Sequence, residues 1–348
     1  MTLIIHRTRS VRITIQPPEG QTIIVENLAF NEGYEVDFEV SRGMDESLGE
    51  ATVRIYNLPA SLRGALEAAQ VRRPDDTDQI LATLGLSAGW QVFGDVMSPT
   101  GTDALTVGFP LIRVEAGYDG SLSTLLDVVG ARIVSSRESE TTYVTEISGS
   151  DALDAVLYAK PTTVFEPGTP TYDVMTFLRL ACGLGNGNVS QAQWSGIVGS
   201  SKLDAYYYST TGGMDALKQL LDFLPLRWWI DGRDLYVIPK DGQPYPVGVP
   251  PPYVPDPPVT PDYLLAMPER VEGGFVEVRS LLTPAVLPGR LLLLSPAILG
   301  LDGATPEQIA RVDVPPGIYR VESVRHSGST AASGGFDTVA VCKRVLDA

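Results

Sequence analysis

Cysteine and histidine are both scarce in this chain of 348 residues, which contains two of each. Structural zinc sites take four Cys or His ligands, so most such sites are excluded within one chain. Cys182 and Cys342 lie far apart in the sequence and show no pairing signature. We expect both to be reduced, buried thiols in a protein made in a cytoplasm.

Basic residues are also few, since 26 Lys and Arg stand against 42 Asp and Glu, which gives a net charge of −16. Proteins that hold nucleic acid through its phosphates need clustered Lys and Arg side chains. Stable binding of nucleic acid is therefore not expected. The acidity is concentrated in residues 1–150, which carry 11 Arg and 21 acidic residues.

Long apolar runs are missing as well. The most apolar stretch, residues 281–299, is interrupted by Arg290 and by three prolines, so no membrane span is expected. The N-terminal residues lack the basic and apolar regions of a secretory signal, and none is expected. The hydrophobic content of 44% is nevertheless that of a folded protein, and the length predicts two or three domains.

Strand patterns dominate the first part of the chain. Glu35, Asp37 and Glu39 alternate with apolar residues, which predicts a strand with a carboxylate at every outward position. The alternation resumes at residues 53–55 after a polar connection, as in a hairpin of two strands. A short helix is predicted at residues 61–70, and further strands at residues 111–116, 131–134 and 143–147.

The period changes to 3.6 in the middle of the chain. Apolar residues at 174, 177, 178 and 181 predict a helix with Thr171 as its N-cap and Gly183 as its stop. A second helix ends before Pro225, and the pair Asp231-Gly232 predicts the turn of a hairpin. Nine prolines then lie between Pro244 and Pro261, which favours a stiff extended segment.

These patterns predict an α+β, mainly β fold in which two β-units flank a small α/β insert. We expect the first β-unit at residues 1–150, with a surface insertion at about 71–108. The α/β unit is expected at residues 151–242, the Pro-rich loop at 243–262, and the second β-unit at 263–348, where strand patterns return.

The motifs that could indicate catalysis are better explained by structure. The G-x-S-x-G match at residues 85–89 is followed by a strand pattern instead of the helix that a nucleophile elbow needs. The glycines at 183–187 follow a helix, so no helix N-terminus is directed at an anion. Cys182 and Cys342 have no cationic neighbours that would pair them with His326 as a thiolate site, and core positions are expected for both. No catalytic residue is therefore predicted.

Read in order, several segments resemble the tail (baseplate) hub family of bacteriophages and related contractile injection machines. The segments that carry this resemblance are residues 51–58 (ATVRIYNL), 114–120 (VEAGYDG), 142–152, 217–235, 281–289 and 317–330. The resemblance spans nearly the whole chain, and the order of the segments carries it.

The resemblance implies a ring of three subunits in which each chain contributes two tube-like β-barrels. Such a homotrimer would present six similar contacts to a hexameric tail tube and three to a central spike. It further implies a place in the tail baseplate of a virion, with the tail tube protein, the central spike protein and the tape-measure protein as partners. Neither catalysis nor a cofactor is implied, and the loop containing His326 is expected to be structural or interfacial.

The carboxylate row of Glu35, Asp37 and Glu39 has two interpretations. On an isolated sheet it is a solvated strand face. In a ring it becomes the lining of an acidic channel, because a negative wall repels DNA and lets it pass without sticking. The alternative function is a tail-associated cell-wall hydrolase or a carbohydrate-binding tail component, which would need an acid/base or thiol–His site.

Overall fold

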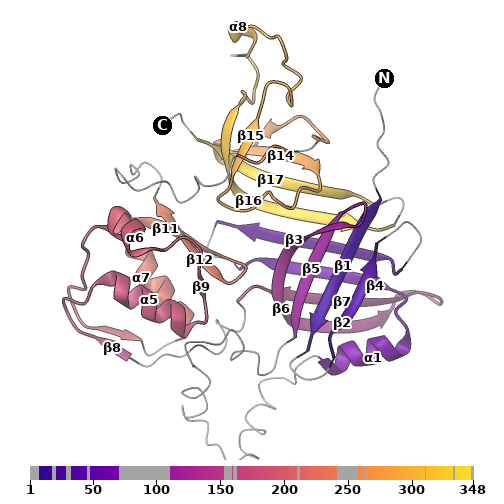
Figure 1. The fold of residues 1–348 in the computed structure, drawn as a ribbon, viewed down its shortest axis with the longest axis horizontal. Coiled ribbons are helices and arrows are strands. Elements are labelled where there is room, and N and C mark those ends of the chain that lie inside the picture. Colours follow the sequence, from indigo (N-terminus) through magenta and orange to yellow (C-terminus); the bar gives the residue numbers. More distant parts are fainter. Residues whose placement is uncertain are drawn as a thin grey trace, which may run out of the picture.

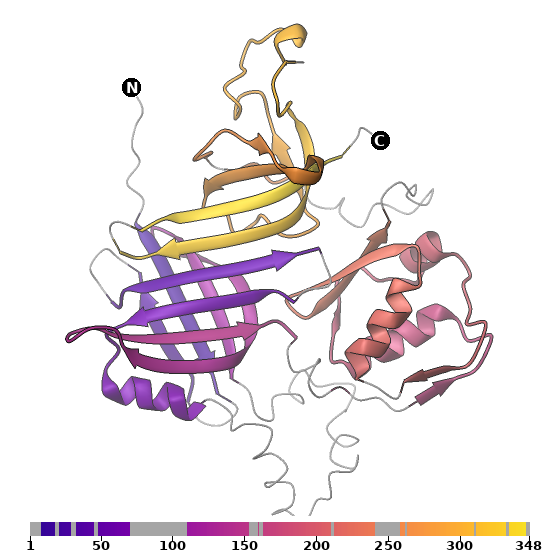
Figure 2. The same cartoon turned by 180° about the vertical axis from the view of Figure 1, so that it is seen from behind.

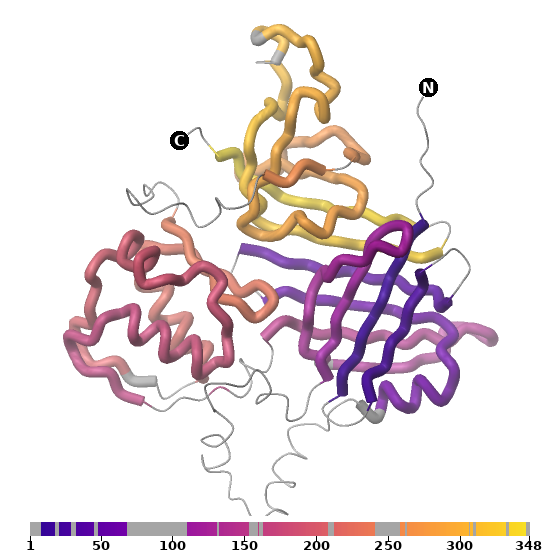
Figure 3. Tube along the Cα trace, in the orientation of Figure 1, coloured from indigo at the N-terminus to yellow at the C-terminus, as the bar shows by residue number. Residues whose placement is uncertain are grey.

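The structure is a computed structural model that describes residues 8–17, 21–28, 33–44, 48–69, 110–152, 159, 163–209, 212–240, 258–261, 263–309, 311–331 and 334–345. The expected surface insertion at 71–108, the G-x-S-x-G match and most of the Pro-rich loop lie outside these residues. Figure 3 shows three parts in chain order: an indigo-to-magenta β-unit, a pink-to-salmon α/β unit and an orange-to-yellow β-unit.

The described residues of the first β-unit form seven strands and one helix. They are β1 (Arg9–Gln16), β2 (Ile23–Asn27), β3 (Val36–Gly43), β4 (Glu50–Tyr56), α1 (Ala60–Ala69), β5 (Leu111–Tyr118), β6 (Ser121–Arg137) and β7 (Tyr143–Ser150). The strands pair in the order β3-β4-β7-β6-β5-β1-β2, all antiparallel. The predicted hairpin of β3 and β4 and the predicted helix α1 are confirmed.

The 17-residue strand β6 curls this sheet. Its first half pairs with β5 and its second half with β7, and the register shifts next to Gly130. A Cβ atom on Gly130 would lie 2.6 Å from Ile112 Cδ1, so a larger residue at this bend would require the Ile112 side chain to move. The sequence predicted only residues 131–134 of this strand, because the bulge interrupts the alternation on which the prediction rests.

In the α/β unit, helices pack against short strands (Figure 1). Its elements are β8 (Thr163–Phe165), α5 (Thr171–Ala181), β9 (Gly185–Asn186), α6 (Gln191–Val198), β10 (Tyr207–Ser209), α7 (Gly213–Asp222), β11 (Leu226–Asp231) and β12 (Asp234–Pro239). Strands β11 and β12 form the predicted hairpin, and β9 pairs with β12 in parallel.

Two local predictions in this unit are corrected. Pro170 takes the N-cap position of α5, and Thr171 is the first helical residue. Its hydroxyl donates to the Ser201 carbonyl and accepts from the Trp194 indole at 3.1 Å. The side chain therefore forms hydrogen bonds within the unit and does not cap the helix. The hairpin turn is shifted by one residue, because Gly232 and Arg233 have φ angles of 58° and 78° while Asp231 still belongs to the ladder.

Five strands lie in the described part of the C-terminal β-unit. They are β13 (Glu269–Arg270), β14 (Val276–Leu281), β15 (Leu291–Leu294), β16 (Gly317–Ser329) and β17 (Phe336–Arg344), with the short helices η1 (Glu272–Gly274) and α8 (Pro306–Ile309). The first part of β16 pairs with β15, and the rest pairs with β3 of the first unit. His326 lies within β16 and is fully buried, so the expectation that it belongs to a loop is wrong.

The pairing of β16 with β3 joins both β-units into one sheet of 12 strands, which Figure 2 shows from behind. The sheet order runs open from β13 to β2, so the described strands do not close into a hydrogen-bonded barrel in either unit. Side chains of the C-terminal unit instead complete the first core: Phe336 and Leu282 are buried in it. The two β-units therefore share both a sheet and a core.

The α/β unit meets this sheet through the hairpin of β11 and β12. Met44, which follows β3, packs with Trp229 and Ile238 in a small buried cluster, and Tyr236 stacks on Trp229. The Met44 amide donates to the Glu322 carbonyl of β16 at 2.7 Å. We call this contact region the joint.

Candidate functional site

The outward carboxylates of β3 follow from its alternation. Val36, Phe38 and Val40 are buried in the first core, which turns Asp37 and Glu39 to the opposite face of the sheet. Glu39 is exposed and Asp37 is partly exposed. Glu35 lies one residue before β3 and is exposed as well.

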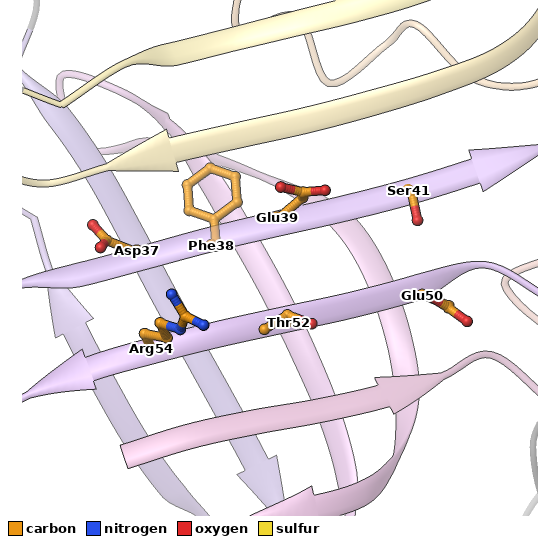
Figure 4. A pocket seen from close by; sticks show the side chains of 7 residues that line it. All are labelled: Asp37, Phe38, Glu39, Ser41, Glu50, Thr52 and Arg54. Atoms are coloured by element: carbon orange, nitrogen blue, oxygen red, sulfur yellow. The ribbon is translucent and has the colours of Figure 1, made fainter. Parts of the chain in front are cut away.

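Asp37 and Glu39 border a shallow hollow of about 340 Å³ on β3 and β4 (Figure 4). Its lining residues are Asp37, Phe38, Glu39, Ser41, Glu50, Thr52 and Arg54. Three carboxylates therefore face one guanidinium, and the hollow is locally acidic. Glu35 is not among the lining residues, so the structure brings together two of the three predicted carboxylates and adds Glu50.

Tyr56 fixes the position of Asp37. Its hydroxyl donates to Asp37 Oδ2 at 2.8 Å. Burial, and secondly this hydrogen bond to an anion, raises the pKa of Tyr56 to about 12, so the phenol keeps its proton at any physiological pH. The Asp37 carboxylate is thus held as an acceptor on the face of the sheet.

Arginines interrupt the acidity both in the hollow and around it. Arg54 stands opposite Asp37 in the ladder and pairs with Glu146 of β7 at 3.0 Å, which raises the pKa of the guanidinium. Cross-strand neighbours on the same face include Arg325 opposite Ser41 and Arg132 opposite Ser148. The acidic surface is therefore restricted to β3 and β4, and the surrounding sheet carries both signs of charge.

The sequence pattern missed Glu50, Arg54 and Glu146 because none belongs to the β3 alternation. Glu50 and Arg54 are outward residues of β4, and their position beside β3 depends on the register of the hairpin. The alternation at residues 53–55 could have identified Arg54 as outward, but a sequence alone does not say which residue stands opposite it.

The residues considered for nucleophilic chemistry lie in separate, closed environments. Cys182 is buried in the core of the α/β unit, and Cys342 is buried in β17, as predicted. Burial raises the pKa of the Cys342 thiol far above its usual range, which disfavours a thiolate. Burial, and secondly the charge of Arg42, lowers the pKa of His326 to about 3, and its Nδ1 lies 2.9 Å from Thr338 Oγ1.

The glycine segment at 183–187 is part of the fold and does not form a phosphate loop. Gly185 and Asn186 form β9, and a Cβ atom on Gly185 would lie 1.9 Å from an Asp234 oxygen. Across the described parts of the chain, no three His, Cys, Asp or Glu side chains are grouped as metal ligands. Among the described helices, none is both long and apolar enough to span a bilayer.

The architecture resembles those of solved tail proteins. The 43 kDa tail protein of prophage MuSo2 from Shewanella oneidensis has a TM-score of 0.52 at 10% identity, and the match covers 96% of this chain and 98% of that one. A tail protein from Neisseria meningitidis MC58 matches with a TM-score of 0.47 at 11% identity, over 96% of each chain. A component of the Escherichia coli type VI secretion system matches with a TM-score of 0.47 at 8% identity, over 90% of this chain and 74% of that one.

The match to the Shewanella oneidensis protein spans almost the full length of both chains, so the two proteins share a fold. At the level of fold, this match agrees with the tail-protein resemblance found in the sequence. No family model matches the sequence, and no curated protein sequence matches it either.

Proposed function

We propose that the chain is a structural component of a phage tail baseplate, the hub that connects the sixfold tail tube to the threefold spike. The observation that carries this proposal is the single sheet in which two β-units lie side by side, in a fold shared over its full length with a prophage tail protein. Three copies would present six β-units to the tube. The two units are not identical, since seven of the described strands belong to the first unit and five to the C-terminal unit.

The open ends of the sheet are the surfaces through which copies would join. Strand β2 lies at one end, where Ile24 is 55% exposed. At the other end, segment 263–270 borders β14, and Leu265 and Met267 are 45% and 67% exposed. Open edges with exposed apolar side chains favour pairing with another chain. Contact between the two ends of neighbouring copies would close a ring.

The oligomeric state tests this proposal. We expect native mass spectrometry of the purified chain, alone or with its tail tube protein, to show three copies. Changing Leu265 and Met267 to Asp should shift the trimer to monomer, because charges would be buried at the contact. The matched control is Leu180→Asp on α5, an exposed leucine far from both edges, which should leave the trimer intact. A strict monomer in every mixture would contradict the hub proposal.

The acidic hollow is proposed to line the channel through which DNA passes. Replacing Glu35, Asp37 and Glu39 by Lys should leave the fold largely intact, because all three side chains point away from the core. The wall would then attract phosphates, and we expect a clear loss of infectivity in particles that carry the variant. The control places three lysines at the exposed positions Glu138, Glu140 and Asp204, with infectivity retained. Full infectivity of the first variant would remove the lining role.

A further inference from the structure

Within the joint, three ionisable side chains from separate parts of the chain are buried together. Arg42 of β3 pairs with Asp231 of β11, with 2.9 Å between Nε and Oδ1, and their side chains are only 10% and 11% exposed. Asp151, which follows β7, is fully buried beside them. Two buried carboxylates thus lie near the guanidinium of Arg42.

Asp151 ties the turn of the α/β hairpin to the first β-unit. Its Oδ2 accepts a hydrogen bond from the Gly232 amide at 3.1 Å, and its own amide donates to the Gly49 carbonyl at 2.9 Å. Its second oxygen, Oδ1, has no hydrogen-bond partner among the described residues. An ionised carboxylate in this place is incompletely satisfied, and its charge is costly.

The neighbouring charges do not compensate Asp151. Arg42 already pairs with Asp231, and Asp231 adds a like charge. The next basic groups, Arg227 and Arg320, are both bound to Glu322. Further titratable neighbours of the joint are Asp234 and Tyr236 on β12, Arg290, and His326 on β16, which is neutral.

Burial is the main reason why the pKa of Asp151 rises to about 7. The Gly232 amide lowers it, the charge of Asp231 raises it, and the Gly49 amide and Arg42 lower it by smaller amounts. The carboxyl therefore titrates near neutrality in the closed joint, but near the ordinary value of 3.8 once it meets water.

We propose that the joint is proton-linked: the hairpin of the α/β unit is held most tightly to the first β-unit while Asp151 carries a proton, and the hold weakens as Asp151 ionises. We call the state in which the hairpin is bound to the first β-unit the closed form. Because the pKa of Asp151 is raised in the closed form, protonation stabilises this form fully at a pH below the ordinary pKa of Asp. This stabilisation is lost as the pH rises to the pKa that Asp151 has in the closed form. The equilibrium constant for opening should increase about tenfold per pH unit between about pH 4 and 7, and stay level above that.

Hydrogen exchange of the full chain between pH 5 and 8.5 tests this inference, with rates corrected for chemical exchange in the unfolded chain. We expect protection of the Gly232 amide and of β11 to fall on the order of a hundredfold from pH 5 to 7 and then to level off. Asp151→Asn keeps a side-chain oxygen for the Gly232 amide but does not titrate, so its protection should not show this fall. Asp204→Asn, at an exposed position, should behave as the wild type.

The pH dependence of protection in the wild-type protein tests the inference even if the Asp151→Asn variant folds poorly. Protection that is constant or rises between pH 5 and 7 would overturn the inference. An equal fall in the wild type and in Asp151→Asn would also overturn it, since the titrating group would then be another one. The difference between these two proteins isolates Asp151 from the other carboxylates and from His326.

Discussion

Replacing Phe336 by alanine is expected to lower the free energy of unfolding by about 3–5 kcal/mol, the range for a large aromatic side chain removed from a packed core. Phe336 belongs to β17 of the C-terminal unit but is buried in the core of the first unit. Its ring makes edge-on contacts with Phe38 and Tyr118, with centroids 5.5 and 5.3 Å away. The loss should therefore destabilise both β-units together.

Chemical denaturation followed by circular dichroism measures this effect, and a single transition that moves as a whole is expected. The chain offers a matched control in Phe223, which is 93% exposed after α7. Phe223→Ala should change stability by less than about 0.5 kcal/mol. Two separate transitions, with only the C-terminal unit affected by Phe336→Ala, would show that the units do not share a core in solution.

Replacing Glu322 by alanine should lower the free energy of unfolding by about 1–3 kcal/mol, because it leaves two partly buried guanidinium groups without their anion. Glu322 Oε2 accepts from Arg227 of β11 at 2.8 Å, and Oε1 accepts from Arg320 at 2.6 Å. The Glu322 side chain is 10% exposed and that of Arg320 is 14% exposed, so water does little to replace the carboxylate. The variant should also weaken the packing of the α/β unit against β16, because the ion pair between Arg227 and Glu322 is lost.

A double-mutant cycle separates the pair from the rest of the joint. Arg227→Met combined with Glu322→Gln should show a coupling energy of about 1–3 kcal/mol in denaturation experiments. The exposed pair Arg54–Glu146 provides the comparison, since 55% and 35% of its side chains are accessible and its coupling should stay below about 1 kcal/mol. Equal coupling energies in both cycles would mean that burial does not determine the strength of the ion pair between Arg227 and Glu322.

A β-bulge explains why Glu322 reaches the joint. The register of β16 against β17 shifts between Val321 and Ser323, so Glu322 is the extra residue and leaves the alternation. The sequence carries a trace of this, because the buried residues Tyr319, Val321, Val324 and His326 are spaced by two, three and two positions. The bulge could have been suspected from that spacing, but its contact with Arg227 could not, since 95 residues separate the two.

Features that depend only on neighbouring residues could be predicted from the sequence. Alternation predicted β3 and β4 and the outward carboxylates Asp37 and Glu39, and the 3.6 period predicted α5 and α7. These features are local because the geometry of one strand or helix decides which side chains share a face.

Which elements lie side by side could not be predicted in this way, and the folded structure was needed to find it. It joined β16 to β3 across nearly 300 residues of chain, placed Phe336 in the first core, and enclosed Asp151 with Asp231 around one arginine. These contacts depend on strand register and on the packing of distant segments, which many different sequences of local elements allow equally well. The acidic hollow shows both sides of this division: alternation supplied two of its carboxylates, and the pairing of β3 with β4 supplied Glu50 and Arg54.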